Sequence, residues 1–72
     1  MTKYNYGDIV KLLDGDLSRI GHIAWIVGVF KFRVGTFFDK FPEGTVYSIE
    51  FEDGDSVEVH ELQLEMVDKT PD

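Results

Sequence analysis

The sequence predicts one small all-β domain built from five short strands. The chain has 72 residues, near the lower limit at which a single hydrophobic core holds a fold without help. It is 43% hydrophobic and 14% aromatic and has no cysteine, so its stability must come from burial rather than from disulfides. Short β-branched and aromatic runs lie between glycine and aspartate turn signals, without a linker or repeat. We therefore expect one domain over residues 1–72, ordered over about residues 6–68, with polar ends that are short and disordered.

The first two strands are predicted from apolar runs that follow glycines. Residues 8–13 form the first, opened by Gly7 and closed by a turn at residues 14–16. Residues 22–30 contain almost no helix-forming residues and predict the second, which alternates beyond Gly28 and could continue to Val34. Strict alternation in residues 23–27 would divide the apolar side chains between two faces. A bulge near Ala24–Trp25 would turn Ile26 inward together with Ile23, and Trp25 partly outward.

A hairpin over residues 46–59 is the clearest element. Residues 46–52 alternate cleanly, residues 53–55 turn the chain, and residues 56–59 return. A two-residue loop at Asp53–Gly54 would bury a carboxylate, whereas a three-residue loop through Asp55 pairs Phe51 with Val57 and places Glu50 opposite Glu58. We expect the three-residue loop. Residues 60–63 then predict a single helical turn and residues 64–67 a closing strand, with Leu62, Leu64 and Met66 or Val67 completing the core.

This order of elements resembles the SH3-like small β-barrels found in KOW modules, in Tudor domains and in one of the small proteins of photosystem I. The resemblance rests on residues 7–10, on residues 21–23 with Ile26, on residues 46–54, and on the turn and strand of residues 59–67. It implies a five-stranded barrel with a short single-turn helix before the last strand. It implies no particular function, because the shared positions are glycines and core residues rather than a catalytic motif.

Charge is distributed unevenly along the chain. Residues 1–42 carry six basic and four acidic residues, and residues 43–72 carry one basic and ten acidic residues, which gives the net charge of −7. Such a field repels phosphate backbones and attracts cationic surfaces, so direct nucleic-acid binding is disfavoured. No apolar run reaches the roughly 18 residues of a membrane span, and the expected location is the cytoplasm.

No residue pattern predicts catalysis, a metal site or a cofactor. His22 and His60 are the only histidines and lie in unrelated segments; we expect His22 at the rim and His60 to cap or hydrogen-bond locally. The carboxylates around Gly54 do not have the spacing of a calcium loop, and a hairpin turn explains them. Phosphate-binding glycine loops are missing, because the glycines are isolated. We therefore expect a protein that is not an enzyme.

Two groups of side chains predict a binding surface. The first is a carboxylate face, which otherwise is a solvated sheet surface: Glu50, Glu52, Asp53, Asp55, Glu58, Glu61 and Glu65. The second is a set of aromatic residues, which otherwise are core and a core-capping loop: Trp25, Phe32, Phe37, Phe38 and Phe41. A domain of this size cannot bury all its aromatic side chains, and an acidic surface rimmed with them suits a basic protein partner.

The expected function is that of a small acidic protein-binding module or accessory subunit that docks on a basic surface of a partner protein. One form of it is an inhibitor or immunity protein of a nuclease or toxin. The alternatives are a structural subunit of a larger complex and, less favoured by the charge, a nucleic-acid-binding barrel. The partner-binding residues expected from the sequence are Glu50, Glu52, Asp53, Asp55, Glu58, Trp25, Phe37 and Phe38.

Overall fold

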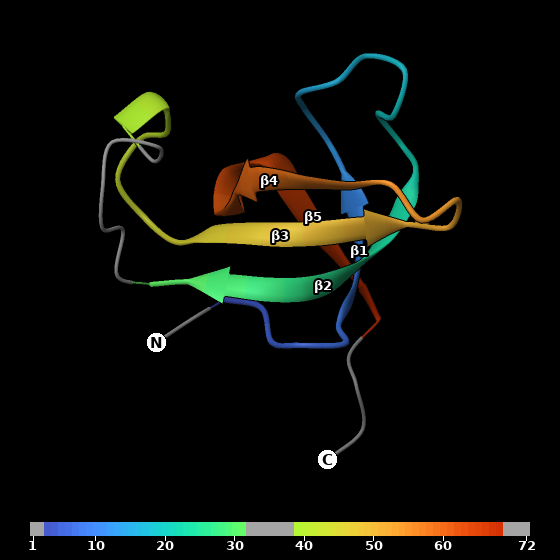
Figure 1. Cartoon of the computed structure of the whole chain (residues 1–72), viewed down its shortest axis with the longest axis horizontal. Coiled ribbons are helices and arrows are strands. Elements are labelled where there is room, and N and C mark those ends of the chain that lie inside the picture. Colours follow the sequence, from blue (N-terminus) through green and yellow to red (C-terminus); the bar gives the residue numbers. More distant parts are fainter. Residues whose placement is uncertain (1–2, 32–38, 69–72) are drawn as a thin grey trace.

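The computed structural model describes residues 3–31 and 39–68, and it confirms the all-β prediction (Figure 1). Within the described residues, the strands and the 3-10 turn that follows the fourth of them succeed one another in a simple order. In order they are β1 (Ile9–Leu12), β2 (Ile23–Phe30), β3 (Val46–Phe51), β4 (Ser56–His60), the turn η2 (Glu61–Gln63) and β5 (Leu64–Asp68). The single turn before the last strand lies where the sequence predicts it.

The strands form one antiparallel sheet with the order β4-β3-β2-β1-β5. The two edge strands, β4 and β5, are adjacent in sequence and joined by η2, but no hydrogen-bonded pairing joins them among the described residues. Figure 1 shows β5 crossing behind β3 and β4, so the sheet curls and its two ends face a common interior. The core cluster accordingly takes side chains from all five strands.

Inward-facing residues of the alternating strands make the core. Its strand residues are Val10, Leu12, Ala24, Ile26, Tyr47, Ile49, Phe51, Val59 and Leu64. Val57 and Met66 are partly buried against this cluster. The expectation that Leu62 completes the core is wrong, because its side chain is 71% exposed. A single 3-10 turn has one face toward the sheet, and Leu62 lies on the other.

The β3–β4 hairpin has the predicted loop length but a different register. Ile49 pairs with Val57 and Tyr47 with Val59, which is two residues away from the predicted pairing of Phe51 with Val57. The loop is residues 52–54, closed by hydrogen bonds from Phe51 N to Asp55 O (2.8 Å) and from Gly54 N to Phe51 O (3.0 Å). The two registers differ by two residues and keep the same side chains inward, so the alternation of apolar and polar residues does not distinguish them. Gly54, with φ of +91°, takes the last loop position, where a left-handed residue is required.

This register corrects the expected pairing of Glu50 with Glu58. Glu50 lies opposite Ser56, and Glu58 lies opposite Ser48. The Ser48 hydroxyl donates a hydrogen bond to Glu58 Oε2 at 3.4 Å. The two carboxylates are therefore diagonal neighbours on the outer face, and the direct like-charge repulsion expected between them is absent from the hairpin.

β2 contains the predicted bulge at a different position. The register against β3 shifts between Ile26 and Gly28, which makes Val27 the extra residue, whereas the bulge expected near Ala24–Trp25 is wrong. Ala24 and Ile26 are buried and Trp25 faces outward, as strict alternation over this part requires. Val27 remains exposed, so the irregularity accommodates a side chain that the core does not take. The described strand ends at Phe30; residues 32–34 lie outside the described residues.

The N-terminal segment is part of the core, contrary to the expectation of a disordered end. Tyr4 is buried, and its ring meets that of Tyr47 edge to face with centroids 5.2 Å apart. The Tyr47 hydroxyl accepts hydrogen bonds from Lys3 N and Tyr4 N, both at 3.0 Å, and the Tyr4 hydroxyl donates to Leu64 O at 3.0 Å. Burial raises the pKa of Tyr4 above its ordinary value. These contacts tie residues 3–4 to β3 and β5.

The predicted local role of His60 is confirmed. Its Nδ1 accepts a hydrogen bond from Leu62 N (3.1 Å) at the start of η2, and its Nε2 lies 2.8 Å from Glu43 O. The Gln63 side chain accepts from His60 N at 2.8 Å, which completes a capping box. His60 thus connects β4, η2 and the segment before β3.

Candidate functional site

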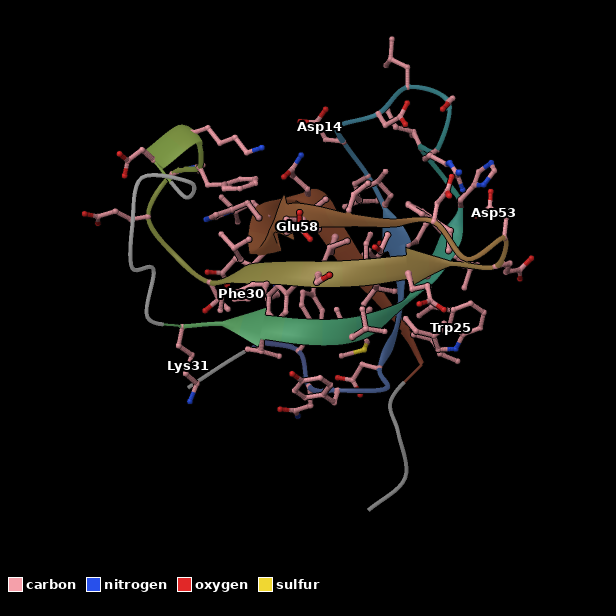
Figure 2. The ribbon with its side chains drawn as sticks, in the orientation of Figure 1. Asp14, Trp25, Phe30, Lys31, Asp53 and Glu58 are labelled. Carbon is pink, nitrogen blue, oxygen red and sulfur yellow. The ribbon has the colours of Figure 1, made fainter. Side chains whose placement is uncertain are left out.

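The hairpin carboxylates predicted as a binding surface separate into two groups. Glu50 and Glu58 stand on the outer face of β3 and β4, and Glu58 points outward from β4 in Figure 2. Glu52 is exposed in the hairpin loop. Asp53 and Asp55 lie at the end of the hairpin, where they face Arg19 of the β1–β2 loop. The structure therefore does not present all five as one free acidic surface.

Arg19 binds both aspartates. Its Nη2 lies 2.8 Å from Asp53 Oδ2 and 2.5 Å from Asp55 Oδ2, and its guanidinium stacks 4.6 Å from the centroid of the Phe51 ring. The Arg19 side chain is only 18% exposed because it is held between these groups. The hydrogen bond from Arg19 lowers the pKa of Asp53 below its ordinary value of 3.8. This cluster joins the β1–β2 loop to the hairpin, which is a structural role.

The depressed pKa of Asp53 predicts a dependence of stability on acid. Because the unfolded Asp53 binds its proton at a higher pH than the folded one, its contribution is present above about pH 4 and is lost as the pH falls through the lowered pKa. We expect the difference in unfolding free energy between wild type and Arg19→Met to shrink below about pH 4. Urea denaturation from pH 7 to 2.5 measures it. A constant difference would contradict the assignment, and Lys11→Met, which removes the longer Lys11–Glu65 pair (3.8 Å), is the control.

Trp25 and Glu50 are the predicted residues that the structure brings together. Trp25 of β2 lies opposite Ile9 of β1 on one side and Glu50 of β3 on the other. Trp25 is 36% exposed, and Figure 2 shows it projecting from the end of β2 nearest to the β3–β4 loop. An outward aromatic side chain thus stands directly beside an outward carboxylate.

Further apolar side chains extend this surface, and sequence patterns alone did not reveal them. Val27 of β2 is 41% exposed and Val67 of β5 is 47% exposed. Val67 lies at the register shift in the β1–β5 pairing, beside Ile9. We call Ile9, Trp25, Val27 and Val67 the outer-face patch. Each valine is the extra residue of a bulge and faces outward. The sequence signal for them is that these strands contain more apolar residues than one buried face can take.

The aromatic residues of the β2–β3 connection are only partly described. Phe32, Phe37 and Phe38, which the sequence predicts either as part of a binding surface or as part of a core-capping loop, lie outside the described residues. Phe41 is half-buried and lines a cleft with residues of β4 and η2. It is not part of the outer-face patch.

Polar groups elsewhere form no reactive constellation in the described parts of the chain. His22 is exposed at the rim, as expected, with its ring 6.5 Å from the centroid of Phe51. Within residues 3–31 and 39–68, no three histidine or acidic side chains are grouped so that they could hold a metal ion. The carboxylates Asp53 and Asp55 are instead bound by Arg19.

Comparisons with protein families, curated proteins and solved structures find no match to this chain. The described residues contain no helix with the length and apolarity that a membrane crossing requires.

Proposed function

We propose that this protein docks on a basic surface of a partner protein through the outer face of its sheet. The observation that carries the proposal is the Trp25–Glu50 pair, an exposed aromatic ring beside an exposed carboxylate on neighbouring strands. The outer-face patch lies around the ring; on the side toward the hairpin Glu50 stands next to Trp25, with Glu58 diagonal to Glu50 on β4, and Glu52 is exposed in the adjoining hairpin loop. Aromatic anchors surrounded by charged groups are typical of protein-binding surfaces.

The two groups would contribute differently to binding. Removing Trp25 and the valines from water supplies affinity, because apolar burial contributes about 25 cal/mol per Å². The carboxylates attract a cationic partner over distances of about a Debye length, roughly 8 to 10 Å at physiological salt. They therefore act mainly on the rate of encounter, and the patch acts on the lifetime of the complex.

Charge on the same face supports a protein partner over a nucleic acid. Lys11 is the basic residue of β1 on this side, and it is paired with Glu65 of β5 at 3.8 Å. The neighbouring hairpin adds Glu50 and Glu58 without a basic residue of its own. A phosphate backbone would meet carboxylates here, whereas lysine and arginine side chains of a protein would be complementary.

Affinity capture with matched variants tests the proposal. The tagged protein is used to capture partners from a lysate of the cells that produce it, with quantitative mass spectrometry as the readout. We expect Trp25→Ala and Glu50→Lys/Glu52→Lys each to reduce capture of basic proteins about tenfold or more. Asp39→Lys/Glu43→Lys makes the same change in net charge on the segment before β3 and should leave capture unchanged. Equal capture by wild type and Trp25→Ala would contradict the proposal.

The salt dependence of the association rate distinguishes an inhibitor that electrostatic attraction brings to its partner from a structural subunit held by apolar contacts. Once a partner is captured, its association rate with the purified protein is measured between roughly 50 and 500 mM salt, a range that shortens the Debye length severalfold. A steep fall in the association rate supports docking through the carboxylates. A rate that does not change with salt favours the structural-subunit alternative.

A further inference from the structure

The second edge of β4 is open with respect to residues 3–31 and 39–68. β4 is at the end of the sheet and pairs only with β3 among the described residues. In an antiparallel hairpin, hydrogen-bonded and non-hydrogen-bonded residue pairs alternate. Phe51 N donates to Asp55 O, so Phe51–Asp55 is a hydrogen-bonded pair, and the next such pairs are Ile49–Val57 and Tyr47–Val59. The backbone N–H and C=O groups of Ser56 and Glu58 therefore point away from β3. An edge with such groups is a template for a further strand.

A cleft of about 550 Å³ lies along this edge. Val57 and Val59 of β4 line it together with Leu12 of β1 on the core side, and Phe41 and Leu62 add apolar surface. Its size lies within the range of ligand-binding clefts, about 300 to 1,000 Å³. The cleft therefore provides room for side chains directly beside the unpaired backbone.

One end of the open edge is closed by hydrogen bonds. His60 N donates to the Gln63 side chain, and Leu13 N donates to Gln63 O at 2.8 Å. The Gln63 side chain also donates to Asp14 O at 3.1 Å. Only the stretch of Ser56 to Glu58 remains available, so an added strand would be short.

The charged residues at the cleft favour a basic segment of another protein over a second copy of this chain. Asp14 and Asp16 lie in its lining together with Lys40, and the Glu58 carboxylate stands on the outer face of the same edge strand, where it accepts from the Ser48 hydroxyl. Pairing of β4 with β4 of a second copy would bring Glu58 close to its own equivalent, in a chain of net charge −7, and like charges on adjacent strands are destabilising. A segment that carries lysine or arginine is complementary instead.

We propose that the open edge of β4 binds an extended segment of a partner protein in which basic and apolar residues alternate. Main-chain hydrogen bonds to Ser56 and Glu58 hold the segment. Its apolar side chains enter the cleft beside Val57 and Val59, and its basic side chains lie on the side of Glu58. The proposal shares with the proposed function the positive charge of the partner and the Glu58 carboxylate, whereas Trp25 and the rest of the outer-face patch belong to the proposed function alone.

A synthetic peptide tests this site on the full chain. The probe is an acetylated and amidated Lys-Val-Lys-Val-Lys-Val peptide, and its affinity is measured by titration while amide hydrogen exchange is followed by NMR. We expect the Ser56 and Glu58 amides to exchange more slowly in the complex than in the free protein. The same peptide with alternate backbone nitrogens methylated keeps its side chains and should bind at least about tenfold more weakly, because it cannot form the ladder. Absence of binding by the unmodified peptide, or equal binding by the methylated one, would overturn the proposal.

Two variants of the protein locate the bound peptide. Ser56→Pro removes an N–H that points to the open edge and keeps the Glu58 carboxylate, so it should weaken binding through the backbone alone, with circular dichroism showing that the sheet remains. If that variant does not fold, the methylated peptide on the wild-type protein decides the question. Trp25→Ala leaves the edge intact and should bind the peptide as wild type does. If Trp25→Ala alone loses the peptide, the ligand sits on the outer-face patch, which overturns strand addition and leaves the proposed function standing.

Discussion

Replacing Tyr47 with phenylalanine is expected to lower the free energy of unfolding by about 1 to 3 kcal/mol, the usual result of leaving a buried backbone donor without its partner. The Tyr47 hydroxyl accepts from both Lys3 N and Tyr4 N, and the Tyr4 amide is buried. Phenylalanine keeps the ring and its edge-to-face contact with Tyr4 at 5.2 Å. The loss therefore reports the hydroxyl rather than a cavity. For a domain of this size it is a large share of the total stability.

Urea denaturation and amide exchange together check this prediction. The exchange rate of the Tyr4 amide should rise more than those of the β3–β4 ladder, because the N-terminal segment loses its attachment to β3. Tyr6→Phe is the matched control, since Tyr6 is 66% exposed and the substitution removes a hydroxyl that is in contact with solvent. If Tyr47→Phe and Tyr6→Phe unfold at the same urea concentration, the hydroxyl does not anchor the segment.

Substituting Gly44 with alanine is expected to destabilise the protein by about 2 to 4 kcal/mol, since two costs combine. Gly44 has φ of +127°, a conformation that alanine adopts with strain. A Cβ there would also lie 2.5 Å from Glu61 Oε1 and 2.7 Å from His60 Nε2. Those atoms hold Thr45 N and Glu43 O, so relieving the clash breaks a hydrogen bond.

Gly54→Ala provides the comparison for Gly44→Ala. Gly54 also has a positive φ, +91°, but nothing lies within 4 Å of a Cβ built on it. It should therefore lose only the conformational part, and Gly44→Ala should exceed it by at least about 1 kcal/mol. Thermal and urea denaturation of the two variants give this difference. Equal losses of unfolding free energy in the two variants would show that the His60 and Glu61 side chains move away from the added Cβ without destabilising the protein.

The hairpin illustrates how far sequence patterns reach. Alternation in residues 46–59 identifies both strands and the inward side chains, because a strand displays its side chains with a period of two. It does not select between two registers that differ by two residues, since both preserve that period. The turn decides, because Gly54 must stand at the left-handed position of a three-residue loop.

The candidate site was predictable to a similar degree. The acidic outer face of the hairpin follows from alternation and charge, whereas Trp25 is outward as predicted but through regular alternation rather than through the bulge expected near Ala24–Trp25. The capture of Asp53 and Asp55 by Arg19 does not follow from these patterns, because Arg19 approaches from a loop 34 residues away in sequence from Asp53. Val27 and Val67 were missed because each lies at a bulge, where the pattern of alternation is interrupted.

By itself, the sequence determined the class of fold, the succession of the strands along the chain, the local capping role of His60 and the acidic character of the C-terminal half. These depend on local periodicity, turn residues and charge, which are read directly along the chain. Only the tertiary structure decided the register of the hairpin, the positions of the bulges, the burial of Tyr4, the Arg19 cluster and the open edge of β4. Each of these depends on which distant segments meet, and many pairings satisfy the same local pattern until the whole core is packed.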